Sequence, residues 1–147
     1  MKKIPTAGFA LLLFAACNGG SNDDAEIKQL RDQAIAVHDE IMPQISTFDR
    51  NTVRIDSLLD HLPQLKQTHA NLDTAQARTE LTALKGKLEN ATDSMMEWMT
   101  DFDTDPQNKT ATEIKTYYEQ EIDKVTQLKQ VFEEVAKESA DQLAPFQ

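Results

Sequence analysis

An apolar repeat in the second half of the chain limits the possible folds most strongly. Seven apolar residues recur there at alternating spacings of three and four: Leu81, Leu84, Leu88, Ala91, Met95, Trp98 and Phe102. This spacing places one continuous apolar stripe along an α-helix, as at the core positions of a coiled coil. A lone helix cannot bury such a stripe, so the pattern predicts that other helices pack against it.

An earlier segment carries a similar stripe, interrupted by proline. Its apolar residues are Ile27, Leu30, Ala34, Val37, Ile41, Ile45, Phe48, Ile55, Leu58, Leu59 and Leu62. Proline removes a backbone donor and its ring clashes with the carbonyl four residues back. Pro43 therefore predicts a kink between Asp39 and Pro43, and Pro63 predicts the end of this helix.

A third helical segment is marked by its start signal. Thr110 and Glu113 have the spacing of a capping box, and the breaker 103–109 separates them from the preceding helix, which Asp73 can cap. The segment ends near Leu143, before Pro145. Its predicted core residues are Ile114, Tyr118, Ile122, Val125, Leu128, Phe132 and Val135.

These three segments predict an all-α fold, because no strand-like alternation occurs in the sequence. Short connections make sequential helices antiparallel neighbours. We therefore expect an up-down-up three-helix bundle with a kinked first helix. Helices of about 30–40 residues would form a rod about 50 Å long.

The N-terminus has the pattern of a signal peptide. Lys2 and Lys3 precede the apolar run Ala7 to Ala16, which is too short to span a bilayer, since that takes about 20 residues. The following Cys17 is the only cysteine, so no intramolecular disulfide can form. Small residues directly before it resemble a lipobox, which implies cleavage after residue 16 and lipid attachment at Cys17. An ordinary secretory peptide with an incidental cysteine is the alternative.

The predicted domain organisation follows from this cleavage. Residues 1–16 form the signal peptide, residues 17–23 the lipidated cysteine with a flexible tether, and residues 24–147 the helical domain. Ser21 to Asp24 resembles the acidic surface-export signal of some Gram-negative lipoproteins, but the same residues suit a helix N-cap. The expected location is the cell envelope, with the chain lipid-anchored to a membrane and either periplasmic or surface-exposed.

Charge narrows the range of partners. Without residues 1–16 the chain has 13 basic and 25 acidic side chains, a net charge of −12. Nucleic-acid binding needs Lys and Arg to displace counterions, so this surface disfavours it. It also disfavours docking on anionic lipid headgroups. A cationic partner would be attracted, although acidity also serves solubility.

One cluster of possible ligands follows from the antiparallel geometry. His38 should face residues 92–100 of the second helix, since both helices rise equally per residue. This places four methionines and one histidine at one level of the rod: His38, Met42, Met95, Met96 and Met99. Thioether and imidazole groups suit Cu(I). Packing is the competing interpretation, because methionine fills irregular gaps beside a kink.

Segments 38–43 (HDEIMP) and 95–99 (MMEWM) with Phe102 resemble a family of small helical bacterial lipoproteins. Some members carry the misleading label "viral A-type inclusion protein". The resemblance covers the chain after Cys17; it implies a membrane-anchored helical domain and supplies no activity.

The sequence contains no set of residues suited to catalysis, because Cys17 would carry lipid and no phosphate-binding loop is present. We therefore expect a non-enzymatic envelope lipoprotein that contacts another envelope protein. The alternatives are a Cu(I)- or Ag(I)-binding lipoprotein and a structural coiled-coil oligomer.

Overall fold

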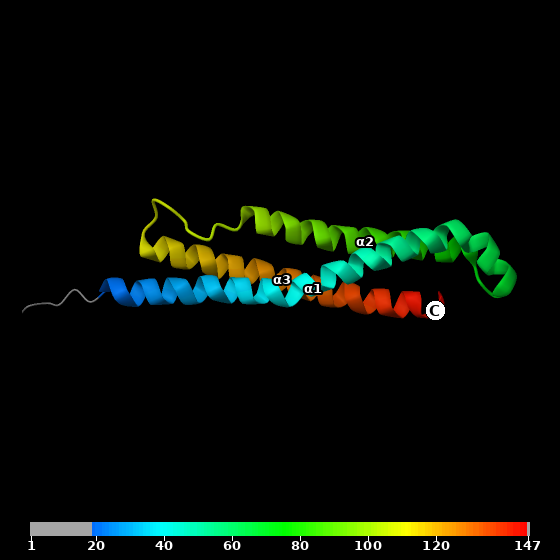
Figure 1. Ribbon diagram of the computed structural model, residues 1–147, viewed down its shortest axis with the longest axis horizontal. Coiled ribbons are helices and arrows are strands. Elements are labelled where there is room, and N and C mark those ends of the chain that lie inside the picture. The colour runs from blue at the N-terminus through cyan, green and yellow to red at the C-terminus, as the bar shows by residue number, and fades with distance from the viewer. Residues whose placement is uncertain (1–18, 147) are drawn as a thin grey trace, which may run out of the picture.

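The computed structural model describes residues 19–146 as three long helices and a short final turn. Helix α1 spans Gly19–Thr68, α2 spans Thr74–Asp101 and α3 spans Ala111–Leu143; a 3-10 turn, η1, follows at Ala144–Phe146. Residues 19–146 contain no strand. Figure 1 shows α1 and α3 running in one direction and α2 in the other. The predicted up-down-up three-helix bundle is confirmed.

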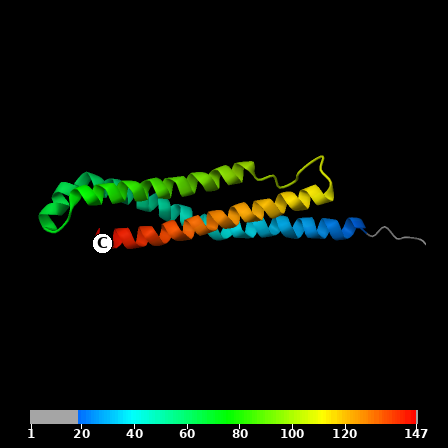
Figure 2. The ribbon, with the colours of Figure 1, turned by 180° about the vertical axis from the view of Figure 1, so that it is seen from behind.

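Helix α1 bends part-way along its length. Figures 1 and 2 show the change of direction in its cyan part, and Pro43 lies in this region by residue number. The first half runs beside α3, and the second half crosses to lie beside α2. Proline withholds the donor that would bond the carbonyl of Asp39, which explains a bend at this place.

The core is built from the predicted stripes. On α1 the fully buried residues recur at seven-residue intervals: Ala34, Ile41, Phe48, Ile55 and Leu62. All six stripe residues of α2 from Leu81 to Trp98 are buried, and Phe102 is half-buried at the cap. The rings of Phe48 and Phe132 stack with centroids 4.9 Å apart and join α1 to α3.

The prediction that Pro63 ends the first helix is wrong, because α1 continues to Thr68. Two side chains contact backbone carbonyls there. The carbonyl of Leu59, which loses its helical donor to Pro63, is contacted by a guanidinium nitrogen of Arg78 at 3.4 Å. Beyond the helix end, Lys66 Nζ donates to the carbonyls of Ala70 and Leu72, each at 2.7 Å.

The start of α1 also differs from expectation. Gly19–Asp23 is helical, whereas a flexible tether was predicted for residues 17–23 and the domain was expected to begin at residue 24. Asp23 therefore lies inside the helix and is not its N-cap. Its carboxylate pairs with Lys115 of α3 at 2.7 Å, and Glu26 pairs with the same ammonium. These contacts hold the beginning of α1 against α3.

The helix-capping predictions are confirmed. The Asp73 carboxylate accepts from the backbone N–H groups of Ala75 and Gln76 at 3.0 Å each. Thr110 and Glu113 form a complete capping box at the start of α3. Helix α3 ends at Leu143, as expected.

The predicted core of α3 needs correction at three positions. Tyr118, Val125, Phe132 and Val135 are buried, but Ile114, Ile122 and Leu128 are only half-buried. Two polar residues, Glu121 and Ser139, are buried instead. Ser139 accepts a 2.8 Å hydrogen bond from the Asn51 side chain of α1, which satisfies its hydroxyl inside the bundle.

The length of the rod was underestimated. Helix α1 has 50 residues and therefore extends about 75 Å at 1.5 Å per residue. None of the described helices is long and apolar enough to cross a membrane. The predicted signal peptide 1–16 and Cys17 lie outside the described residues.

Candidate functional site around Trp98

Side chains from all three helices meet near the end of α2. Trp98 is 7% exposed, and its ring stacks on His38 of α1 with centroids 5.8 Å apart. Phe102, one turn later, stacks on Trp98 at 4.8 Å and lies 6.0 Å from Tyr118 of α3. We term these four side chains the aromatic layer. It fixes the end of α2 against both neighbouring helices.

Two tyrosines hold the connection between α2 and α3 to this layer. The Tyr118 hydroxyl donates to the carbonyl of Thr104 at 3.0 Å, and the Tyr117 hydroxyl accepts from the N–H of Asp103 at 2.7 Å. Burial raises the pKa of both tyrosine hydroxyls above the ordinary value of 10.0. Both hydroxyls are therefore protonated at neutral pH.

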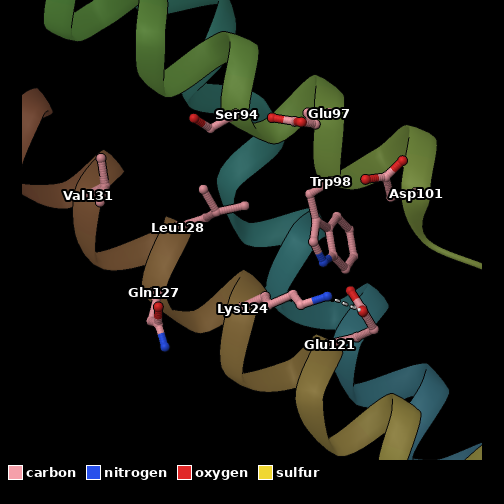
Figure 3. Close-up of a pocket in the computed structure, with 9 residues that line it drawn as sticks. All are labelled: Ser94, Glu97, Trp98, Asp101, Glu121, Lys124, Gln127, Leu128 and Val131. Carbon is pink, nitrogen blue, oxygen red and sulfur yellow. Dashed lines mark hydrogen bonds and ion pairs between the residues drawn. The ribbon is translucent and has the colours of Figure 1, made fainter.

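Trp98 forms part of a groove of about 400 Å³ between α2 and α3, which we term the α2–α3 groove (Figure 3). Its apolar lining comes from Trp98, Leu128 and Val131. Val131 is 43% exposed, an unusual degree for a large apolar side chain in this bundle. The groove thus presents apolar surface that the bundle itself leaves partly uncovered.

The polar side of the α2–α3 groove contains an unpartnered donor beside an ion pair. Trp98 Nε1 is buried and has no hydrogen-bond partner within residues 19–146. Figure 3 shows this nitrogen turned toward α3, where Lys124 Nζ pairs with a carboxylate oxygen of Glu121 at 2.7 Å. This pairing raises the pKa of Lys124. Buried donors are usually hydrogen-bonded, so this indole N–H is an unsatisfied donor beside the groove.

Sequence reasoning missed Glu121, which is 4% exposed. A signal was present, because Glu121 follows Tyr118 by three residues and precedes Val125 by four, which is the core spacing. Because Glu121 is charged, it was expected to be exposed, and Ile122 was predicted to be buried in its place. Lys124, one turn later on α3, supplies the countercharge that makes the burial tolerable.

A second pocket, of about 210 Å³, lies on the other side of Trp98, between α1 and α2. We term it the His38 pocket. His38 and Asp39 line it from α1, and Trp98, Met99 and Phe102 line it from α2. His38 therefore faces residues 98 and 99, within the range predicted from antiparallel geometry.

The two ring nitrogens of His38 have different surroundings. Nδ1 lies 2.9 Å from a carboxylate oxygen of Asp39. Nε2 is buried and has no hydrogen-bond partner in the described part of the chain. The side chain as a whole is 18% exposed.

The four methionines of the predicted cluster occupy different environments. Met95 is completely buried in the core, while Met96 is 50% exposed. Met99 is 39% exposed and lines the His38 pocket. Met42 is half-buried and packs against the core. The structure thus brings His38 and Met99 together and leaves Met96 outside their pocket.

Over residues 19–146, no three His, Cys, Asp or Glu side chains lie close enough together to hold a metal ion. Metal binding by His38 and the methionines stays a prediction. Comparison of the chain with known protein families, with curated proteins and with solved structures found no match.

Proposed function

We propose that this chain is a lipid-anchored, non-enzymatic module of the bacterial cell envelope. Its α2–α3 groove would dock a basic segment of another envelope protein. The observation that carries the proposal is the groove itself, which combines partly exposed apolar surface, a buried indole N–H without a partner and an excess of carboxylates.

The sequence around Cys17 supports the anchor. A basic start, a short apolar run and two alanines directly before the only cysteine fit lipoprotein processing. Two or three acyl chains would make the attachment effectively permanent, since each buried methylene contributes about 0.8 kcal/mol. The resemblance to small helical bacterial lipoproteins favours the same class.

The position of the groove suits a partner close to the membrane. His38, which stacks on Trp98, lies 19 residues after the start of α1, or about 30 Å along the helix. If lipid holds Cys17 in the bilayer, the aromatic layer and the α2–α3 groove beside it would lie in the membrane-proximal half of the rod.

Charge favours a basic segment as the occupant. Glu97, Asp101 and Glu121 line the groove, against a single cation, Lys124, which already pairs with Glu121. Among residues 19–146, Glu97 and Asp101 form no ion pair. Two lysine or arginine side chains of the partner would neutralise them.

The remaining features of the groove fit the same occupant. An apolar side chain of the partner would rest on Leu128 and Val131, and a backbone carbonyl would accept from Trp98 Nε1. This arrangement corresponds to a segment laid into a groove between two helices.

Replacement of Cys17 tests the anchor. We expect Cys17→Ser to escape cleavage after residue 16, because no thiol remains for the lipid. Asn22→Ser is the matched control and should be cleaved normally and stay with the membrane. Membrane attachment and normal cleavage of Cys17→Ser would contradict the proposal.

Site-specific photocrosslinking in intact cells tests the groove. A photoreactive residue at Gln127, in the groove, should capture a protein through a peptide that contains lysine or arginine. The same residue at exposed Glu80, at the far end of α2, should not capture it. Charge reversal by Glu97→Lys with Asp101→Lys should abolish the adduct, whereas Glu80→Lys should preserve it. An adduct that survives the groove reversal, or no adduct at Gln127, would contradict the proposal.

A further inference from the structure

We propose that the His38 pocket binds one soft monovalent cation, Cu(I) or Ag(I). The ligands would be Nε2 of His38 and the sulfur of Met99, a two-coordinate set of the kind that these ions accept. This inference goes beyond the docking function and does not depend on it, because the His38 pocket and the α2–α3 groove lie on opposite sides of Trp98.

The histidine has the surroundings of a metal ligand. A ligating histidine almost always donates its other ring N–H to a carboxylate, a carbonyl or water, which fixes the tautomer and raises ligand basicity. Asp39 lies 2.9 Å from Nδ1 of His38 and can accept such a bond. The lone pair then lies on Nε2, which is buried and unpartnered within residues 19–146. Coordination would satisfy this nitrogen.

A thioether ligand is supplied by α2. Met99 lines the pocket that His38 lines, and its partial exposure leaves an access route for an ion. Thioether is a soft ligand and imidazole a borderline one, and together they favour Cu(I) over hard divalent ions.

Trp98 adds an aromatic wall to this site. Its ring lies 5.8 Å from that of His38, and it lines the same pocket together with Phe102. A cation near an aromatic face is attracted by the ring quadrupole. The apolar surroundings also limit water access to a bound ion. The one carboxylate that lines the pocket, Asp39, is occupied by the histidine.

The other three methionines of the predicted cluster are not assigned as ligands. Met95 is completely buried among core side chains and Met42 packs against them, so we assign both to packing. Met96 is half-exposed and does not line the pocket. Met96→Leu is therefore a matched control for Met99→Leu, because both changes remove one exposed sulfur from the same helix.

The test uses the chain without residues 1–18, which retains all three helices and the entire described core. Trp98 is the only tryptophan, so its fluorescence reports directly on the pocket. Titration with Cu(I) under anaerobic conditions against a Cu(I) chelator, and with Ag(I) in parallel, should change this fluorescence with saturation at one ion per chain.

Variants then identify the ligands. We expect His38→Gln and Met99→Leu each to weaken binding at least about tenfold, since even loss of an outer-shell partner costs 10- to 100-fold in metal affinity. Met96→Leu should bind as the wild type does. Far-ultraviolet circular dichroism verifies that each variant is folded, and if His38→Gln unfolds, Met99→Leu alone decides.

Three results would overturn the proposal. One is the absence of saturable binding in the wild-type chain. Another is unchanged binding in folded Met99→Leu. The last is an equal loss of affinity in Met96→Leu and Met99→Leu, which would indicate nonspecific binding to exposed thioethers.

Discussion

Met95 and Met96 are adjacent in sequence but have opposite environments. Met95 is fully buried in the core, whereas Met96 is half-exposed. We expect Met95→Ala to lower the free energy of unfolding by about 2–5 kcal/mol, because it leaves a cavity among packed side chains. Met96→Ala should change it by less than about 0.5 kcal/mol. Urea denaturation measures both, and equal losses would place Met95 outside the core.

At the residue scale, the sequence predicted the apolar core well and the polar exceptions poorly. The spacing alone identified Met95 and Trp98 as core residues, and antiparallel geometry placed His38 opposite residues 92–100, a range that includes its observed stacking partner Trp98. Glu121 was missed because its burial depends on Lys124 and on the neighbouring helix, neither of which enters a hydrophobic pattern. The unpartnered nitrogens of His38 and Trp98 likewise depend on tertiary packing.

Gly86 lies in the interior of α2, where a substitution can stabilise the helix. Nothing lies within 4 Å of a Cβ atom added there, and the backbone is helical. Alanine has a higher helix propensity than glycine, since glycine loses more backbone freedom on folding. Gly86→Ala should therefore raise the free energy of unfolding by about 0.5–1 kcal/mol in urea denaturation. A loss of stability would mean that the site is less open than the structure shows.

The capping box of α3 makes a pH-dependent contribution to stability. Hydrogen bonds from the backbone N–H and the hydroxyl of Thr110 hold the pKa of Glu113 below its ordinary value of 4.5. A carboxyl with a lowered pKa in the folded state stabilises the protein above its unfolded-state pKa. That contribution is lost as the pH falls through the folded-state pKa.

The variant Glu113→Gln tests this contribution, because it keeps the shape of the side chain but removes its charge. We expect its melting temperature to lie below that of the wild type at pH 7. The difference should shrink as the pH falls below 4.5 and through the lower pKa of the folded-state carboxyl. Thermal melts at several pH values measure it. A difference that is constant with pH would show that the charge contributes nothing.

At the element scale, start and stop signals were reliable where a side chain caps the helix, whereas the stop signal at Pro63 failed. Asp73 and Thr110 marked their helices correctly because their hydrogen bonds are local. Pro63 did not stop α1, because Arg78 contacts the carbonyl that the proline leaves without a donor. The helical start at Gly19 also depends on another element, through the pair between Asp23 and Lys115.

At the scale of the whole molecule, cross-helix ion pairs mark the register at which α1 packs against α3. The pairs Asp23–Lys115 and Glu40–Lys129 join residues separated by 92 and 89 positions, so both report nearly the same register along the parallel helices. Asn51 and Ser139 continue this register with a separation of 88. The sequence predicted the order of the helices but not this register, because surface charges have many possible partners.

The distribution of apolar surface bears on whether the bundle self-associates. Within residues 19–146, the exposed large apolar side chains are Val53, Met96, Met99 and Val131, spread over three helices. They form no continuous stripe of the kind that a coiled-coil oligomer would bury. We therefore expect the chain without residues 1–18 to be a monomer. Sedimentation equilibrium should give the monomer mass, while size-exclusion chromatography should show early elution because α1 extends about 75 Å. A dimer or larger mass at micromolar concentration would instead favour a structural coiled-coil oligomer.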